Sequence, residues 1–326
     1  MIHDGYNWVI KEISKQLADN INKHNYAKAT TSESYNFIFK KILHFNSVTI
    51  PRKFNTNKTI MTWYHVVKND PRLTQLEEIS SRIDKLHTSA NITKNTLINH
   101  GFPEDKIVVL PMGIDLKMFT QSTQKDKTRQ REFLNIPQNK FVIGSFQKDG
   151  NGWEKGMEPK LIKGPDIFCD TVEQVAKNYP VHILLSGPAR GYVKARLEQA
   201  KISFTHTLVA NYSDMNLLYQ ACDAYLISSR NEGIPMALLE TWATGTPLVS
   251  TRVGMVADVA INGHNALIAD INDSDTLVAS LIKLIEDETL KNQLISNSQI
   301  TIQQFSWDVL TEKYWKELYS PLLHLL

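Results

Sequence analysis

The chain has 326 residues, of which 42% are apolar and 21% charged, with 36 Lys and Arg against 34 Asp and Glu. At about 150 residues per domain this length predicts two domains, and the near-average composition excludes a wholly disordered, collagen-like or coiled-coil chain. The net charge of +2 comes without a basic stripe interleaved with aromatic residues, so we expect no nucleic-acid partner.

In the first third of the chain, short β-prone runs alternate with helical ones, which is typical of a parallel α/β layer. Trp8–Asn22 carries apolar residues at helical spacing and predicts the first helix. A doubly wound layer normally begins with a strand, whereas this sequence begins at the loop before Trp8, so we expect a reduced first domain that lacks its first strand. The other predicted helices are Tyr35–Leu43, Leu73–Ile83 and Ile92–His100, and the predicted strands are Val48–Ile50, Thr59–Tyr64, Leu86–Ser89 and Ile107–Leu110.

From Gln121 to Glu132 the sequence holds four Lys or Arg and three Gln without an aliphatic residue, which predicts a linker. A second alternating block follows, and a last amphipathic helix, Trp307–Tyr319, begins after Ser306 as its N-cap. Any site is expected outside the carboxyl ends of the strands. The predicted strands of this block are Phe141–Phe146, Val181–Ser186, Ala224–Ser228 and Pro247–Ser250, and its helices are Lys163–Asn178, Val193–Gln199, Met215–Ala221, Pro235–Ala243 and Thr276–Ile285.

The two cysteines, Cys169 and Cys222, lie in separate apolar stretches, which favours buried thiols in a reducing compartment over a disulfide. The sequence has no C-x-x-C or H-E-x-x-H spacing, so no metal site is predicted. The first residues do not resemble a secretory signal, and no apolar run reaches the roughly 20 residues that span a bilayer. We therefore expect a cytoplasmic protein.

The most informative segment is S-S-R-N-E-G-I-P-M-A-L-L-E-T-W-A-T-G-T-P, residues 228–247. Gly233 permits a tight turn after the buried strand, and Pro235 suits the first helical position, where its missing N–H costs nothing. The N–H groups of Met236 and Ala237 would then be unbonded at the positive end of the helix dipole. This arrangement predicts an anion site suited to phosphate.

Two carboxylates flank the predicted phosphate. Glu240 lies one turn further along the same face as Met236, and its two oxygens suit a vicinal ribose diol. Glu232, in the loop before the helix, would face the other side of the phosphate, where a sugar would lie. The residues alone leave an alternative open, in which Glu232 caps the helix and Glu240 is solvated or ion-paired.

The spacing of Glu232 and Glu240, E-x7-E, resembles the signature of the retaining glycosyltransferases of the group 1 family (family 4) when taken together with G-I-P at 233–235 and A-T-G-T-P at 243–247. Further segments resemble that family in the same order along the chain. They are P-M-G-I-D at 111–115 with Phe119, Leu217–Tyr225, Val253-Gly254 and N-G-H-N-A at 262–266.

The resemblance implies the α/β fold named GT-B, in which two Rossmann-like domains face each other across a cleft and no metal is required. It implies three parts here: an acceptor-side domain at 1–122, a nucleotide-sugar-binding domain at 123–305, and a helix at 306–326 that crosses back to the first domain. Without a metal, the leaving diphosphate needs protein cations. The family's G-R pair is Gly144-Ser145 in this chain, so Lys148 is the candidate for the first cation, and Lys163, in K-G-P-D, matches the second.

The resemblance also implies roles for other residues. His65 follows a predicted strand and would contact the transferred sugar, although a lone histidine is also common as a structural residue. Gly5 lies in a loop that would approach the diphosphate, and Tyr212 ends a loop that would lie near the base. Glu232 would orient the donor sugar and Glu240 would bind the ribose. Phosphate contacts fall on Gly233, Ile234, Pro235, Met236 and Ala237.

The predicted function is transfer of a sugar from a nucleoside-diphosphate sugar to a glycan or lipid-linked acceptor, with retention of configuration. A lipid-linked acceptor would bring the protein to the inner face of the membrane. Two alternatives stay open: a sugar-nucleotide epimerase of the same fold, and a partner subunit that binds nucleotide without turnover. The insertion Asn151–Leu161 has no assigned role.

Overall fold

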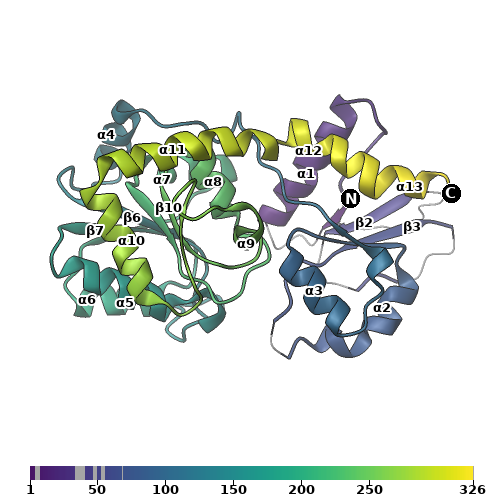
Figure 1. The fold of residues 1–326 in the computed structure, drawn as a ribbon, viewed down its shortest axis with the longest axis horizontal. Coiled ribbons are helices and arrows are strands. Elements are labelled where there is room, and N and C mark those ends of the chain that lie inside the picture. Colours follow the sequence, from purple (N-terminus) through teal and green to yellow (C-terminus); the bar gives the residue numbers. More distant parts are fainter. Residues whose placement is uncertain (4–7, 34–40, 47–49, 53–55, 68, 326) are drawn as a thin grey trace. The chain divides into compact units, whose positions relative to one another are not determined.

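The computed structural model describes residues 1–3, 8–33, 41–46, 50–52, 56–67 and 69–325, and they form two compact units (Figure 1). Unit 1 comprises Met1–Asp115 with Gln304–Leu326, and unit 2 comprises Leu116–Gln303. Each unit has one parallel sheet with helices on both faces. The predicted α/β class with two Rossmann-like layers is therefore confirmed.

The sheet of unit 2 has the strand order β11-β10-β9-β6-β7-β8, and all of its pairings are parallel. The chain starts in the middle at β6, winds outward to β8, then crosses to β9 and winds to the other edge. The loops after β6 and β9 therefore diverge at a switch point, where open α/β sheets bind ligands. The strands are β6 (Phe141–Phe146), β7 (Val181–Ser186), β8 (Phe204–Thr207), β9 (Ala224–Ile227), β10 (Leu248–Thr251) and β11 (Leu267–Ala269).

Helices cover both faces of this sheet (Figure 1). One face carries α5 (Pro165–Ala176), α6 (Gly191–Gln199) and α10 (Ser274–Glu286). The other carries α4 (Gln124–Phe133), α7 (Met215–Ala221), α8 (Met236–Thr244) and α11 (Glu288–Ile302). Buried aliphatic side chains such as Ile143, Val172 and Leu281 fill the space under the first set, which explains the near-continuous apolar runs of these strands.

Several elements of unit 2 differ from the sequence predictions. The predicted linker contains helix α4, which begins with a capping box between Thr123 and Asp126. Buried Arg131 of this helix pairs with Asp223 at 2.6 Å, so a charged side chain anchors the helix and no apolar pattern marks it in the sequence. Strands β8 and β11 and helix α11 were not predicted. β8 is only partly buried and β11 has three residues, so both give weak apolar patterns.

The sheet of unit 1 has the order β1-β2-β3-β4-β5 among the described residues, again with parallel pairings. Helix α1 (Trp8–Lys23) and α12 (Trp307–Tyr314) pack together over one face, and α2 (Leu76–Arg82) and α3 (Asn91–Asn99) lie on the other (Figure 1). The strands are β1 (Ile2–His3), β2 (Ile42–Asn46), β3 (Lys58–Thr62), β4 (Lys85–Thr88) and β5 (Ile107–Val109).

Unit 1 corrects two sequence predictions. The strand expected to be missing is present as β1, which has two residues and pairs with β2 through Ile2 and Phe45. The second strand lies at Ile42–Asn46, earlier than the predicted Val48–Ile50, so Ile42 and Leu43 belong to a strand and not to the end of the predicted helix Tyr35–Leu43. Residues 34–40 and 47–49 lie outside the described residues. A short apolar run fits either a strand or a buried helix, which explains the error.

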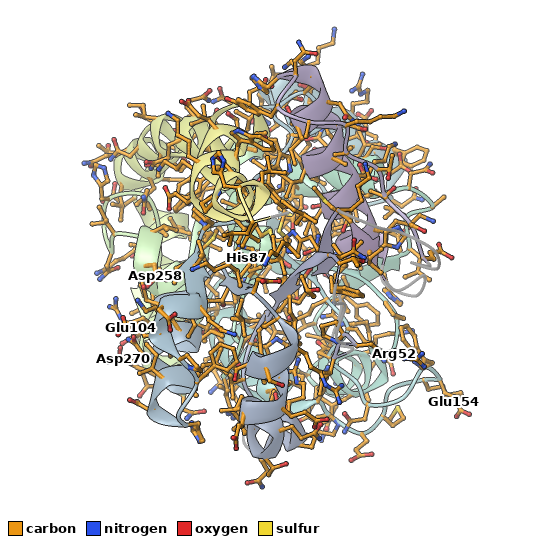
Figure 2. The ribbon with its side chains drawn as sticks, turned by 90° about the vertical axis from the view of Figure 1, so that its right-hand side faces the viewer. Arg52, His87, Glu104, Glu154, Asp258 and Asp270 are labelled. Carbon is orange, nitrogen blue, oxygen red and sulfur yellow. The ribbon has the colours of Figure 1, made fainter. Side chains whose placement is uncertain are left out.

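The C-terminal segment of unit 1 closes over its sheet. The indole ring of Trp307 lies so close to Gly113 that a Cβ there would be 2.5 Å from a ring carbon, so the glycine of the P-M-G-I-D segment is required for packing. A π-helical turn, Trp315–Tyr319, follows α12, and a short helix, α13 (Ser320–Leu323), follows it. Tyr319 and Tyr314 hydrogen-bond to the buried His44 and His87, at 2.7 and 3.1 Å; Figure 2 labels His87 within unit 1.

None of the described helices combines the length and the apolar character needed to cross a membrane.

Candidate functional site

Most of the predicted site residues of unit 2 lie after β6 or after β9, at the switch point of the sheet; Tyr212 follows β8. The chain leaves β6, forms the insertion, and enters α5 through a short 3₁₀ turn, η3 (Leu161–Lys163). It leaves β9 through Ser228–Pro235 and enters α8. The N–H groups of Arg230 and Asn231 both donate to the carbonyl of Ile162, at 2.9 and 3.1 Å, so the two loops are fixed to each other.

The loop that carries Glu232 is held by close backbone contacts. The N–H of Met255 donates to Gly233 O at 2.9 Å, and a Cβ on Gly254 would lie 2.4 Å from that oxygen. Gly254 has φ +47°, whereas Gly233 does not adopt a positive φ, so the left-handed turn falls in the V-G segment rather than at Gly233. Pro235 precedes the helix as its N-cap and is not the first helical residue. Ile234 lies between them and is partly buried.

Glu232 and Lys163 are 69 residues apart in sequence and form an ion pair, with Lys163 Nζ donating to Glu232 Oε1 at 2.5 Å. The Ser229 hydroxyl donates to the same oxygen at 2.9 Å. The Glu232 side chain is 9% exposed and that of Lys163 23%, so the pair is largely shielded from water. Glu232 makes no cap bond to α8, and the capping alternative is therefore wrong.

Helix α8 presents an open amino end. The first helical residues, Met236 and Ala237, are partly exposed, and the described residues offer no acceptor for their N–H groups; the first intrahelical donor is Leu238 N, which bonds to Pro235 O at 2.9 Å. The helix dipole adds positive potential at this end. The Ile162 carbonyl links the segment that carries Lys163 to the segment that enters α8. The Lys163 ammonium and the open N–H groups of α8 are the kinds of group that bind a phosphate.

Glu240 is buried in α8, with 4% of its surface exposed, and both of its oxygens accept phenolic hydrogen bonds. Tyr212 donates to Oε1, and Tyr219 donates to Oε2 at 2.5 Å. Burial raises the pKa of Glu240, while the two phenolic donors act in the opposite direction. The alternative in which Glu240 is solvated or ion-paired is wrong. Phe119 packs edge-on against Tyr212, so the P-M-G-I-D-x-x-x-F segment supports this side of the site.

Within the described part of the chain, Lys148 forms no hydrogen bond or ion pair with Glu232. Its Nζ lies 3.7 Å above the centroid of the Trp153 ring, in a cation–π arrangement. Trp153 belongs to the insertion and is 75% exposed. Figure 2 shows the neighbouring Glu154 at the edge of the molecule, with its side chain directed outward.

A buried ion pair beneath the insertion was not predicted. Arg190 Nε lies 3.0 Å from Asp149 Oδ1, and both side chains are at most 1% exposed. Arg190 Nη1 also donates to the carbonyls of Ser145, Gln147 and Ser186, at 2.6, 3.1 and 2.8 Å. Burial raises the pKa of Asp149, and the Arg190 charge opposes that shift. Neither residue stands out in the sequence, because nothing local shows that a charged pair is buried.

In unit 1, His65 follows β3, and its carbonyl accepts from Trp63 Nε1 at 3.1 Å and from Arg72 Nη2 at 3.4 Å. The guanidinium of Arg72 stacks on Trp63 at 4.2 Å and binds Asp70. The backbone at His65 is therefore firmly fixed at the carboxyl edge of the sheet. Gly5 lies outside the described residues.

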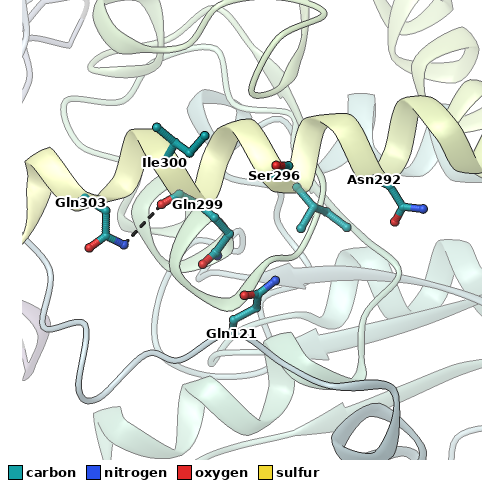
Figure 3. A pocket seen from close by; sticks show the side chains of 7 residues that line it. Gln121, Asn292, Ser296, Gln299, Ile300 and Gln303 are labelled. Atoms are coloured by element: carbon teal, nitrogen blue, oxygen red, sulfur yellow. Dashed lines mark hydrogen bonds between the residues drawn. The ribbon is translucent and has the colours of Figure 1, made fainter.

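A separate groove of about 740 Å³ runs along α11, between Gln121 and the amides of Asn292, Gln299 and Gln303 (Figure 3). None of the predicted site residues lines it. Within the described part of the chain, no group of three or more His, Cys, Asp or Glu is placed to hold a metal ion.

Two units, each with a parallel sheet and helices on both faces, are the architecture of the GT-B fold. Solved structures agree: Anabaena HepE in complex with UDP and glucose has a TM-score of 0.69 at 20% identity over 81% of this chain and 72% of that chain. Sucrose-phosphate synthase of Thermosynechococcus elongatus has a TM-score of 0.72 at 15% identity, over 98% of this chain and 80% of its own.

Residues 158–301 match the family model of glycosyl transferases group 1. The segment includes Lys163, Glu232 and Glu240. A curated relative, the D-inositol 3-phosphate glycosyltransferase of Corynebacterium urealyticum, is 25% identical over 239 residues, which are 69% of this chain and 54% of the relative. The chain thus spans about half the length of the curated relatives it matches.

Proposed function

We propose that the protein is a retaining, metal-independent glycosyltransferase that moves a sugar from a nucleoside-diphosphate sugar to a glycan or lipid-linked acceptor. The observation that carries the proposal is the Lys163–Glu232 pair beside the open N-terminus of α8. It joins a cation and two N–H donors for a diphosphate with a carboxylate for sugar hydroxyls. The likeness to HepE, solved with UDP and glucose, supports a nucleotide-sugar donor.

Lys163 supplies the positive charge that the departing diphosphate needs. With no donor bound, Glu232 holds the ammonium at 2.5 Å, which keeps it oriented in a partly buried position. A diphosphate that enters beside α8 offers the ammonium stronger anionic acceptors. The negative charge on the leaving oxygen grows as the sugar bond breaks, and donors held in place stabilise that state without reorganisation.

Glu232 orients the donor sugar by accepting hydrogen bonds from its hydroxyls, while Ser229 keeps the carboxylate in position. In the proposed front-face reaction, the bond between the anomeric carbon and the phosphate oxygen breaks. A bond to the acceptor oxygen forms on the same face, and the acceptor proton passes to the leaving phosphate oxygen. Glu232 is then a binding and orienting group and forms no covalent bond.

The remaining roles follow the same assignment. Gly233, Ile234 and Pro235 shape the turn beside the diphosphate, and Glu240 with Tyr212 forms the nucleoside side of the site. His65 and Gly5 of unit 1 belong to the proposed sugar and acceptor side. Lys148 enters the proposal as the first cation named from the family resemblance.

The first test is a thermal-shift screen with UDP, ADP, GDP and their glucose conjugates, because a ligand that binds only the folded state raises the melting temperature. Donor turnover is then measured for Glu232→Gln and Lys163→Met. Each variant is expected to lose about 10²- to 10³-fold in kcat, as for the loss of one oriented transition-state donor. Glu198→Gln and Lys177→Met, exposed in the same unit, are matched controls and should keep wild-type turnover.

Unchanged turnover in both Glu232→Gln and Lys163→Met would contradict the assignment of these residues to the donor site. The products separate the alternatives: isomerised donor without an acceptor indicates an epimerase, and tight nucleotide binding with no turnover against any acceptor indicates a non-catalytic partner subunit.

A further inference from the structure

The insertion after β6 forms a short hairpin that packs against the backbone of unit 2. Gly150 and Pro159 form an antiparallel bridge between its two arms. The N–H of Asn151 donates to Glu158 O at 2.8 Å, next to that bridge. A Cβ on Gly150 would lie 2.3 Å from Ala189 O, so the first arm lies directly on the chain that follows β7. The conformation of the hairpin is therefore set by the body of unit 2.

The tip of the hairpin is fixed to helix α6. Lys155 O accepts the N–H of Gly191 at 2.7 Å, and Gly156 O accepts that of Tyr192 at 3.0 Å. The hairpin thus supplies acceptors for the first two N–H groups of α6, which no residue within the helix can satisfy. Gly156 has φ +69°, and a Cβ on it would lie 2.2 Å from Ala189 O, so glycine is required there. A tip held in this way binds a ligand with little loss of conformational freedom.

Trp153 lies at this tip, with 75% of its surface exposed. The Lys148 ammonium lies 3.7 Å from the centroid of its ring, so one face of the indole carries a cation that holds the ring in place. The other face is open to solvent. A large, rigid aromatic ring gives contact area to a ligand at a low cost in side-chain entropy. The indole is therefore a platform on which a ligand ring can stack.

The platform belongs to the same connection as the cation of the candidate site. Residues 147–164 join β6 to α5 and include both the indole and Lys163, which binds Glu232. Burial lowers the pKa of Lys160, and the charges of Lys163 and Lys148 lower it further. The Glu232 carboxylate acts on that pKa in the opposite direction. The cation under the indole and the carboxylate proposed for the donor sugar thus both lie within electrostatic range of one ammonium group.

The charge of the hairpin favours a neutral ligand. Residues 151–158 contain Glu154, Lys155 and Glu158, which is one positive charge against two negative ones. An anionic membrane or a nucleic acid would require an excess of positive charge. The exposed carboxylates can instead accept hydrogen bonds from hydroxyl groups, and the indole face fits the C–H face of a pyranose ring. A sugar offers both kinds of contact.

We propose that the hairpin binds a pyranose ring of a glycan acceptor by stacking it on the open face of Trp153. This inference rests on the proposed function, and it narrows the acceptor to a molecule that presents a sugar ring next to the donor sugar. The insertion, which had no assigned role, becomes the part of unit 2 that recognises the acceptor. Lys148 supports the platform from the opposite face of the ring.

The test is binding of the full chain, with the nucleoside diphosphate found in the screen, to an array of immobilised oligosaccharides of glucose, galactose, mannose and N-acetylglucosamine. Truncation of a tryptophan that anchors a ligand weakens affinity by about 10-fold or more. Trp153→Ala should therefore weaken the strongest glycan interaction by at least about 10-fold, and Trp153→Phe by less than about 3-fold. Phe133→Ala removes a ring that is 77% exposed on α4 of the same unit, and should match the wild type.

A second measurement separates acceptor binding from the reaction of the donor. Hydrolysis of the nucleotide sugar by water requires no glycan. Trp153→Ala should therefore keep the wild-type rate of donor hydrolysis and the wild-type affinity for the nucleoside diphosphate. Its melting temperature should also be unchanged, because the side chain that is removed is mostly exposed.

The outcomes separate this inference from the proposed function. Wild-type protein that binds neither a nucleoside diphosphate nor a glycan contradicts both. Nucleotide binding without binding to any glycan of the array overturns this inference alone, and so does glycan binding that Trp153→Ala leaves at the level of Phe133→Ala. An equal loss of glycan and nucleotide binding in Trp153→Ala would show a general effect on unit 2 and would overturn it. Binding to phosphatidylglycerol vesicles that depends on Trp153, without glycan binding, would assign the hairpin to a membrane instead.

Discussion

The buried carboxylate of Glu240 offers the sharpest test of how the nucleoside is held. Both of its oxygens accept tyrosine hydroxyls, from Tyr212 and Tyr219, so a ribose diol would compete with these donors for the carboxylate. Tyr212 precedes α7, in the segment expected beside the base, and is the candidate to move. We predict that Glu240→Gln removes the recognition of the ribose hydroxyl and leaves phosphate recognition intact.

The magnitude follows from the bond that is lost. A hydrogen bond to a charged group contributes about 1.5–3 kcal/mol, or about 10- to 100-fold in affinity. The wild type should therefore prefer the nucleoside diphosphate found in the screen over its 2′-deoxy analogue by that factor. Glu240→Gln should reduce the preference to less than about 3-fold. Tyr212→Phe should keep it, because that change removes only the competing hydroxyl.

The assay is calorimetric titration of both ligands into the wild type and the two variants, with melting temperatures to show that each variant is folded. A glutamine cannot accept from both tyrosines, and an unpaired buried hydroxyl costs about 1–3 kcal/mol of stability. We therefore expect a lower melting temperature for Glu240→Gln, and that decrease by itself says nothing about ribose recognition. The same preference for the ribose hydroxyl in all three proteins would refute the reasoning and leave Glu240 as a purely structural acceptor.

Two further predictions concern stability. Burial lowers the pKa of His87 to about 4 and that of His44 well below 6.5, so the unfolded chain binds protons that the folded chain does not. The free energy of unfolding of unit 1 should then fall by about 1.4 kcal/mol per pH unit for each histidine below pH 6.5, and for His87 the loss should end near pH 4. In urea unfolding, His87→Gln should make the stability depend less steeply on pH. The same pH dependence in the wild type and the variant would contradict the assignment to His87. Arg190→Met should lower the free energy of unfolding of unit 2 by about 3–5 kcal/mol in urea, because it leaves Asp149 buried without a partner. The double variant with Asp149→Leu should recover much of that loss. A cost below about 1 kcal/mol for Arg190→Met would show that the pair is not required.

The sequence was sufficient for the parts of the molecule that local patterns encode. Buried strands such as Phe141–Phe146 and Val181–Ser186 are continuous apolar runs, and both were predicted with their observed bounds. The start of α8 was predicted to within one residue: Pro235 is its N-cap and not its first residue, and the N–H groups of Met236 and Ala237 are open as expected. The sequence was misleading at α4, because a helix of charged residues has the composition of a linker. It was also misleading at Ile42–Leu43, because a short apolar run fits either a helix or a strand.

What only the tertiary structure decided is the set of partners of the charged side chains. Lys163 and Glu232 are 69 residues apart, and Tyr212 is 28 residues from Glu240. Lys148 was assigned to the diphosphate from its place after β6, yet its ammonium lies on an indole of the insertion. Periodicity reports which face of an element is buried, because that depends on each element alone. The groups that neutralise a buried charge come from other elements, and only the packed fold brings them within hydrogen-bond distance.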